Sequence, residues 1–156
     1  MNYLLMSIRA RYAELILSGK KTLEIRKSAP RGQRERCEYT VLIYESKQDG
    51  GRGLIVGGFE CRRIRSVTEA EVREVCRGAC LTRDELQEYA ERTQRFTEAG
   101  NSRPTHSGRI YAWSVENPVT FEKPITLQDV GVRCPPQSWR TLKESQAMKI
   151  GGVPNE

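Results

Sequence analysis

Apolar and polar positions alternate over several short segments of this chain, and such a period of two predicts β-strands. Four of these segments lie in the N-terminal half, at residues 2–9, 22–27, 38–45 and 54–65. Residues 11–18 instead place Tyr12, Leu15 and Ile16 on one face of a short helix that ends at Gly19. The chain therefore begins with strands and one short helix.

Two further helices are predicted after the fourth strand. Each begins with a potential capping box, formed by Thr68 with Glu71 and by Thr82 with Glu85. Strand patterns return at residues 109–115 and 121–127, so strands and helices do not alternate regularly as in a doubly wound parallel sheet. The order favours an α+β fold, a small and mostly antiparallel β-barrel with flanking helices. We expect one domain over residues 1–144 and a flexible C-terminal tail over residues 145–156.

The junction between the first helix and the second strand carries the most informative polar pattern. Side chains in a strand alternate between faces, so Leu23 and Ile25 point toward a core. Glu24 and Arg26 share the opposite face, and Lys21 precedes them at its mouth. A lysine, a glutamate and an arginine are therefore predicted to converge, either as a functional site or as an ion-pair cluster that ties helix to strand.

The charge of the chain favours an anionic partner. The 156 residues have a formal net charge of +6, and residues 1–65 hold 14 Lys and Arg against 7 Asp and Glu. A basic region of this kind is typical of nucleic-acid binding, although a solvated surface has the same composition. The absence of a long apolar run or a signal-peptide pattern predicts a cytoplasmic protein, not a membrane protein.

The residues of both ends of the chain resemble the ASCH domain family, whose β-barrel is related to the PUA fold. Gly19, Lys21, Glu24 and Arg26 match the spacing of that family's signature. The first strand and helix, and the late segment at residues 135–139, are also similar to the family, so the resemblance spans residues 3–142. It implies a PUA-like barrel with a cleft between barrel and helices, lined by Lys21, Glu24 and Arg26.

The resemblance implies RNA or a modified nucleotide as the ligand. Members of the family are associated with RNA binding, and particular members with RNA cleavage or with removal of an acyl group from cytidine. The alternative is therefore a hydrolase, either a ribonuclease or an amidohydrolase acting on an acylated cytidine. The small bacterial amidohydrolases of the superfamily carry a threonine at the position of Glu24. A third possibility is a protein-interaction domain in the regulation of transcription or translation, which would use the acidic helices between residues 68 and 98.

If the cleft is catalytic, Glu24 is the natural general base, and Lys21 or Arg26 would stabilise developing negative charge. Such chemistry would be metal-independent. The only histidine is His106, and Cys76 and Cys80 lack a second cysteine pair, so we expect no metal and no cofactor.

Other residues extend the predicted ligand site. Tyr44 and Trp113 are aromatic candidates for base stacking, with core packing as the favoured role of both. Trp139 could contact ligand or plug the barrel, beside a polar turn that contains Gln137 and Ser138. Arg9 ends the first strand and is a further ligand-binding candidate. The basic loop could follow a phosphate backbone or be merely solvated; its members are Lys27, Arg31, Arg34 and Arg36.

Overall fold

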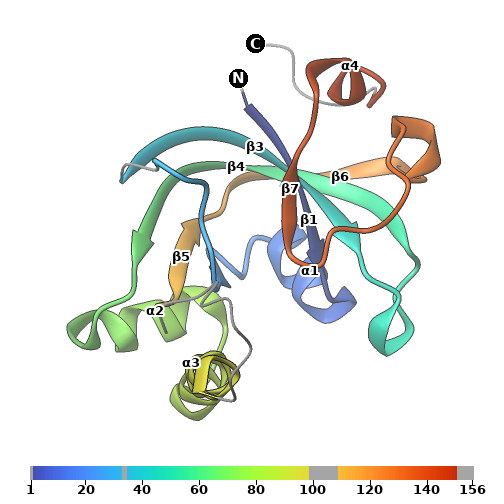
Figure 1. Cartoon of the computed structure of the whole chain (residues 1–156). Coiled ribbons are helices and arrows are strands. Elements are labelled where there is room, and N and C mark those ends of the chain that lie inside the picture. Colours follow the sequence, from blue (N-terminus) through green and yellow to red (C-terminus); the bar gives the residue numbers. More distant parts are fainter. Residues whose placement is uncertain (1, 33–34, 99–108, 151–156) are drawn as a thin grey trace.

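The computed structural model describes residues 2–32, 35–98 and 109–150, with the side chains of residues 92–98 excepted. Seven strands form one curled sheet, with helices at two of its sides (Figure 1). The strands are β1 (Asn2–Ile8), β2 (Leu23–Arg26), β3 (Arg36–Glu45), β4 (Leu54–Ser66), β5 (Tyr111–Ser114), β6 (Glu116–Ile125) and β7 (Trp139–Thr141). The α-helices are α1 (Ala10–Leu17), α2 (Val72–Ala79), α3 (Arg83–Glu98) and α4 (Glu144–Ala147), and the 3₁₀ helices are η1 (Gln48–Gly50), η2 (Glu69–Glu71) and η3 (Gln128–Val130).

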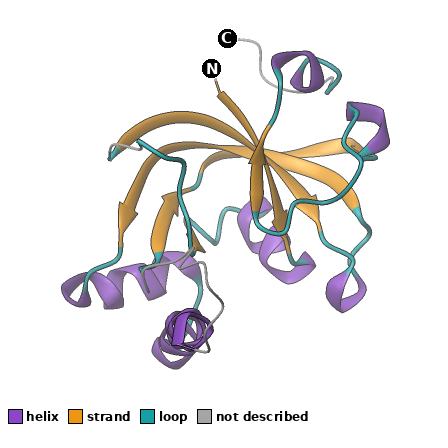
Figure 2. Ribbon diagram, viewed as in Figure 1, coloured by secondary structure: helices purple, strands orange, loops and turns teal. Residues whose placement is uncertain are grey.

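The sheet has the strand order β2-β5-β4-β3-β1-β7, and β6 pairs with β4 beside this path. Among the described strands only β1 and β3 run parallel, and the other pairs are antiparallel. The strands curl over α1 as a half-barrel (Figure 2). The expected α+β class, with a mostly antiparallel barrel and flanking helices, is confirmed.

Alternation along β1 divides the main core into two layers. Leu4, Met6 and Ile8 point into the curl of the sheet, where they pack with Ile16 of α1. Leu5 points to the opposite face and packs with residues near α4. A third cluster fills the space between β2, β5 and the helices α2 and α3, and it includes Ile25, Val75, Leu86 and Ala112. The face of β2 that carries Ile25 is therefore covered by helices.

Several element boundaries differ from those that the sequence predicts. β6 begins at Glu116, five residues before the predicted strand, although it contains Pro118 and Pro124. Its only described partner is β4, and an edge strand tolerates proline because one row of its N–H groups has no ladder partner. Thr82 and Glu85 form the predicted capping box, whereas Thr68 makes no side-chain cap hydrogen bond.

The packed part of the structure extends further toward the C-terminus than we expected. Residues 144–147 form α4, and Ala147 and Ile150 are almost fully buried. Ile150 belongs to the same cluster as Leu5 and Leu142, which lies across the sheet from α1. The predicted boundary at residue 144 therefore does not coincide with the end of the packed structure.

Within the described residues, no helix combines the length and the apolar character that a membrane span requires.

Candidate functional site

The turn after α1 sets the position of Lys21. Gly19 adopts a left-handed conformation with φ of +81°, which a glycine reaches without steric cost. Its N–H donates to the carbonyl of Ile16, and the N–H of Lys21 donates to the carbonyl of Leu15. These bonds close the helix and direct the chain into β2, so that Lys21 comes to lie beside the first residues of that strand.

Lys21, Glu24 and Arg26 do converge as the strand pattern predicts. The Lys21 Nζ lies 3.6 Å from Glu24 Oε2, and the Arg26 Nε lies 3.1 Å from Glu24 Oε1. The Lys21 and Glu24 residues are only 2% and 6% exposed. One buried carboxylate thus lies between two cations, and this cluster, which we call the ion triad, is formed by Lys21, Glu24 and Arg26.

Three hydrogen bonds hold the cations of the ion triad in place. Lys21 Nζ donates a hydrogen bond to the carbonyl oxygen of Ala79 at the end of α2, at 2.5 Å. Arg26 donates to the Ser7 carbonyl through Nη2 at 2.6 Å and to the Ser138 hydroxyl through Nη1 at 3.4 Å. Helix α2, strand β1 and the segment before β7 therefore all meet at the triad.

Burial lowers the pKa of Lys21 from its ordinary value, because removing the ammonium from water disfavours its charged form. The charge of Glu24 opposes this shift, and Arg26 adds to it. Glu24 Oε2 itself is buried and has no hydrogen-bond donor with good geometry among the described residues.

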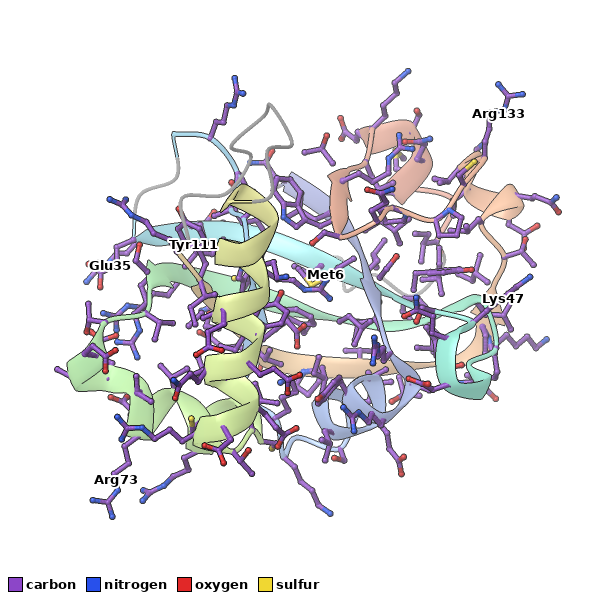
Figure 3. All side chains as sticks on the ribbon, turned by 60° about the horizontal axis from the view of Figure 1, so that its bottom comes forward. Met6, Glu35, Lys47, Arg73, Tyr111 and Arg133 are labelled. Carbon is purple, nitrogen blue, oxygen red and sulfur yellow. The ribbon has the colours of Figure 1, made fainter. Side chains whose placement is uncertain are left out.

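A cleft of about 860 Å³ opens over the ion triad. Its walls come from the end of β1, from α1, from the segment after β3 that includes η1, from the start of α3, and from residues 135–137. Figure 3 views this side of the molecule, with α3 at the front, α1 and η1 to its right, and Lys47 labelled at η1. The prediction of a cleft beside the first helix is confirmed.

Cations dominate the lining of the cleft. Six lysine and arginine side chains reach it, against three carboxylates. Glu24 is already paired within the ion triad, whereas Arg11 and Lys47 are exposed at the surface. Arg9 is half exposed and lies 3.6 Å from Asp49, an exposed pairing that contributes little and leaves Arg9 accessible to a ligand. The lining of the cleft therefore carries an excess of positively charged side chains.

Three tyrosines add aromatic surface to the same cleft, one each from α1, β3 and α3: Tyr12, Tyr44 and Tyr89. Arg11 and Lys21 lie over the ring of Tyr12, at 4.5 Å and 5.0 Å from its centroid. Lys27 lies 4.6 Å from the ring centroid of Tyr89. Burial raises the pKa of Tyr89, so its hydroxyl stays protonated near neutral pH.

The predicted ligand residues separate into two groups. Those that line the cleft are the members of the ion triad with Arg9, Lys27, Tyr44 and Gln137. Ser138 lies outside the lining but contacts Arg26. Trp139 also lies outside it, packs 5.8 Å from the ring of buried Trp113, and donates from Nε1 to the Ser28 hydroxyl. The packing of Trp139 matches the plug that we considered as its alternative role.

The basic loop does not enter the cleft as a unit. Arg31 and Arg36 are exposed and do not line the cleft. Arg36 belongs to β3, where it pairs with Arg63 of β4. Arg34 and His106 lie outside the described residues. Of the three loop cations that the structure describes, only Lys27 lines the cleft.

Arg11, Tyr12, Lys47 and Tyr89 line the cleft, although the sequence does not predict them as ligand residues. The helical pattern places Tyr12 on the apolar face of the first helix. The sequence signal for a ligand role of Tyr12 is the basic residue directly before it, Arg11. Tyr89 belongs to a helix more than sixty residues from the signature, so only the packing of α3 against β2 brings it there.

The curled sheet and the basic cleft beside α1 define the class of protein, a PUA-like barrel of the α+β type. The chain belongs to the ASCH domain family, because the sequence model of that family matches residues 6–125. No curated protein matches the chain.

Solved structures support the fold. The ASCH protein of Zymomonas mobilis is 19% identical and superposes with a TM-score of 0.62, covering 94% of this chain and 92% of its own. A single-residue variant of that protein gives a TM-score of 0.66 at 19% identity and covers 96% of both chains. At this identity the likeness shows the fold alone.

Proposed function

We propose that this protein binds single-stranded RNA and holds one nucleotide in the cleft over the ion triad. The observation that carries the proposal is the meeting of cationic, aromatic and buried polar groups in one concave site. Phosphate requires cations, a nucleobase favours stacking on aromatic rings, and its polar edge requires fixed hydrogen-bonding groups. The cleft of this chain contains all three kinds of group.

Each region of the cleft then has a distinct task. Arg9, Arg11 and Lys47 are accessible and would contact phosphate oxygens. Tyr12 belongs to α1, lies beside Arg11 and Lys21, and would offer its ring to a base for stacking. The ion triad lies deepest, where the Glu24 side chain is 9% exposed and would accept a hydrogen bond from the exocyclic amine or imide of a base.

Membership of the ASCH family supports RNA as the polymer. A concave site also favours a single strand, because a base must leave its helical stack before it can enter a cleft and lie on a side chain. The net charge of +6 adds a favourable electrostatic contribution to association with any RNA. We therefore expect affinity that falls as salt concentration rises.

Tyr12→Ala is expected to weaken binding of a single-stranded RNA octamer about tenfold, because a stacked base contributes about 1–3 kcal/mol. Tyr12→Phe should retain most of the affinity, since its ring can still stack. Fluorescence anisotropy with a labelled octamer measures both. Tyr3→Ala is the matched control, because Tyr3 is also half buried but packs against the opposite face of the sheet. Equal decreases in affinity in the Tyr12 and Tyr3 variants would contradict a stacking role.

A hydrolase that uses the same cleft is the second candidate. It is favoured by the buried Glu24 carboxylate, which has a cation on either side of it in the ion triad. Glu24 would take a proton from the attacking water, while Arg26 and protonated Lys21 stabilise negative charge on the substrate. The substrate would be an RNA phosphodiester or the amide of an acylated cytidine.

Turnover separates the hydrolase from a binding protein. Wild-type protein is incubated with single-stranded RNA and with N4-acetylcytidine, and products are followed by chromatography. If the protein is a hydrolase, the wild type forms product and Glu24→Gln does not, because this variant keeps the shape of the side chain and removes its basicity. Saturable binding without product in the wild type would leave a recognition domain and exclude the hydrolase.

A further inference from the structure

The structure contains a second concave site, which lies on the other face of β2. It has a volume of about 470 Å³ and is lined by β4, β5, α2 and the segment that leads into β2. Four of its lining residues are cations, namely Lys20, Arg63, Arg65 and Arg77, and the only lining carboxylate is that of Glu74. This site, which we call the second cleft, shares no lining residue with the cleft over the ion triad.

The cations of the second cleft are not all neutralised. Arg65 is paired with Glu71 at 3.6 Å and with Glu74 at 3.7 Å, and Arg63 forms an ion pair with Glu35. In the described part of the chain, neither Lys20 nor Arg77 has a carboxylate within ion-pairing distance, and both are exposed. Two accessible cations therefore border a pocket in which the exposed Arg63 and the more buried Arg65 are held in place by carboxylates.

The two clefts are neighbours across a thin wall. Lys21 lines the first cleft, whereas its sequence neighbours Lys20 and Thr22 line the second. This segment is bonded to the end of α2, because the N–H of Thr22 donates to the carbonyl of Gly78 and Lys21 Nζ donates to that of Ala79. A Cβ on Gly78 would lie 2.8 Å from the Leu23 side chain, so the close approach of α2 depends on this glycine.

We propose that the second cleft binds phosphate groups of the RNA strand that flank the nucleotide held in the first cleft. The proposal rests on the proposed function and adds a second contact region to it. A strand that passes over the wall formed by residues 20–22 would meet Lys20 first and then Arg77. Both side chains would neutralise backbone phosphates, while the exposed Thr22 hydroxyl offers a neutral hydrogen bond. A second cleft of this kind does not distinguish base sequences, and it lengthens the bound segment.

The length of the RNA ligand separates the contributions of the two clefts. A nucleoside monophosphate is too short to span both clefts and is held by base and phosphate together only in the first, whereas a single-stranded octamer reaches both. We expect the wild type to bind the octamer more tightly than the monophosphates. We expect Lys20→Glu with Arg77→Glu to weaken octamer binding about tenfold, and to lower the slope of log affinity against log salt by about 0.7 for each phosphate that is no longer neutralised. Monophosphate affinity should stay at the wild-type value.

Lys123→Glu with Arg133→Glu is the matched control, because it changes the net charge equally at two exposed side chains that line neither cleft. Equal decreases in octamer affinity in the two double variants would overturn the second cleft and leave the first intact. The second cleft would also be overturned if the wild type bound the octamer no more tightly than the nucleoside monophosphates. A wild type that binds neither ligand overturns the proposed function, and the second cleft with it.

Discussion

Replacing Glu24 by alanine is expected to lower the free energy of unfolding by about 3–5 kcal/mol, because it leaves two cations in a largely buried site without their carboxylate. Lys21 is 2% exposed, and the Arg26 side chain is 12% exposed. Lys21→Met should cost less, since Glu24 then still pairs with Arg26 at 3.1 Å. Urea denaturation of both variants measures the difference. Glu14→Ala on the exposed face of α1 is the control, with an expected change within about 0.5 kcal/mol.

The destabilisation in Glu24→Ala is also expected to depend on pH. Glu24 raises the pKa of Lys21 against the effect of burial, so its removal lets that pKa fall further. A lysine whose pKa is lower in the folded state destabilises the fold while it is protonated. This cost disappears as the pH rises through the folded pKa toward the unfolded value. The deficit of Glu24→Ala should therefore shrink between neutral and alkaline pH. A deficit that is independent of pH would contradict a charged, buried Lys21.

Reversing the charges of Arg9 and Arg11 together is expected to weaken binding of single-stranded RNA about a hundredfold or more. Each charge-assisted hydrogen bond to phosphate contributes about 1.5–3 kcal/mol, and the double variant removes two such bonds. Both side chains line the cleft from the start of α1, and neither is buried. The fold should be retained, since the exposed pairing of Arg9 with Asp49 contributes little.

Salt titration distinguishes the removal of phosphate-binding groups from a general change in net charge. The slope of log affinity against log salt should fall by about 0.7 for each phosphate of a single strand that is no longer neutralised. Lys123→Glu with Arg133→Glu changes the charge by the same amount at exposed side chains outside both clefts and should leave the slope nearly unchanged. If Arg9 and Arg11 contact no phosphate, the two double variants will give the same slope and the same affinity.

Much of the ion triad could be predicted because its members are close in sequence. Glu24 and Arg26 share one strand face by the period of two, and the turn at Gly19 brings Lys21 beside them. The anchors could not be predicted in the same way. Ala79 lies 58 positions from Lys21, and Ser138 lies 112 positions from Arg26. Those hydrogen bonds depend on how α2 and the segment before β7 dock onto the sheet, and no local pattern encodes that docking.

The aromatic residues show the same limit. The polar turn before Trp139 is compatible with a place at the rim and with a plug of the barrel. The structure places its ring beside Trp113, because β7 pairs with β1 and directs this side chain inward. Tyr89 reaches the cleft because α3 packs over the face of β2 that carries Ile25. The C-terminal segment is short and polar, which predicts a tail, but the isolated Ile150 fills a site beside Leu142.

The most direct test of a nucleotide site over the ion triad is an NMR titration of the isotope-labelled protein with ribonucleoside monophosphates, which follows each backbone amide. We predict saturable shifts at residues 9, 11, 12, 21, 24–27, 44 and 46–48, which line the first cleft, with little change along β6. Shifts confined to helix α2, or no shifts at millimolar ligand, would contradict a nucleotide site over Lys21, Glu24 and Arg26.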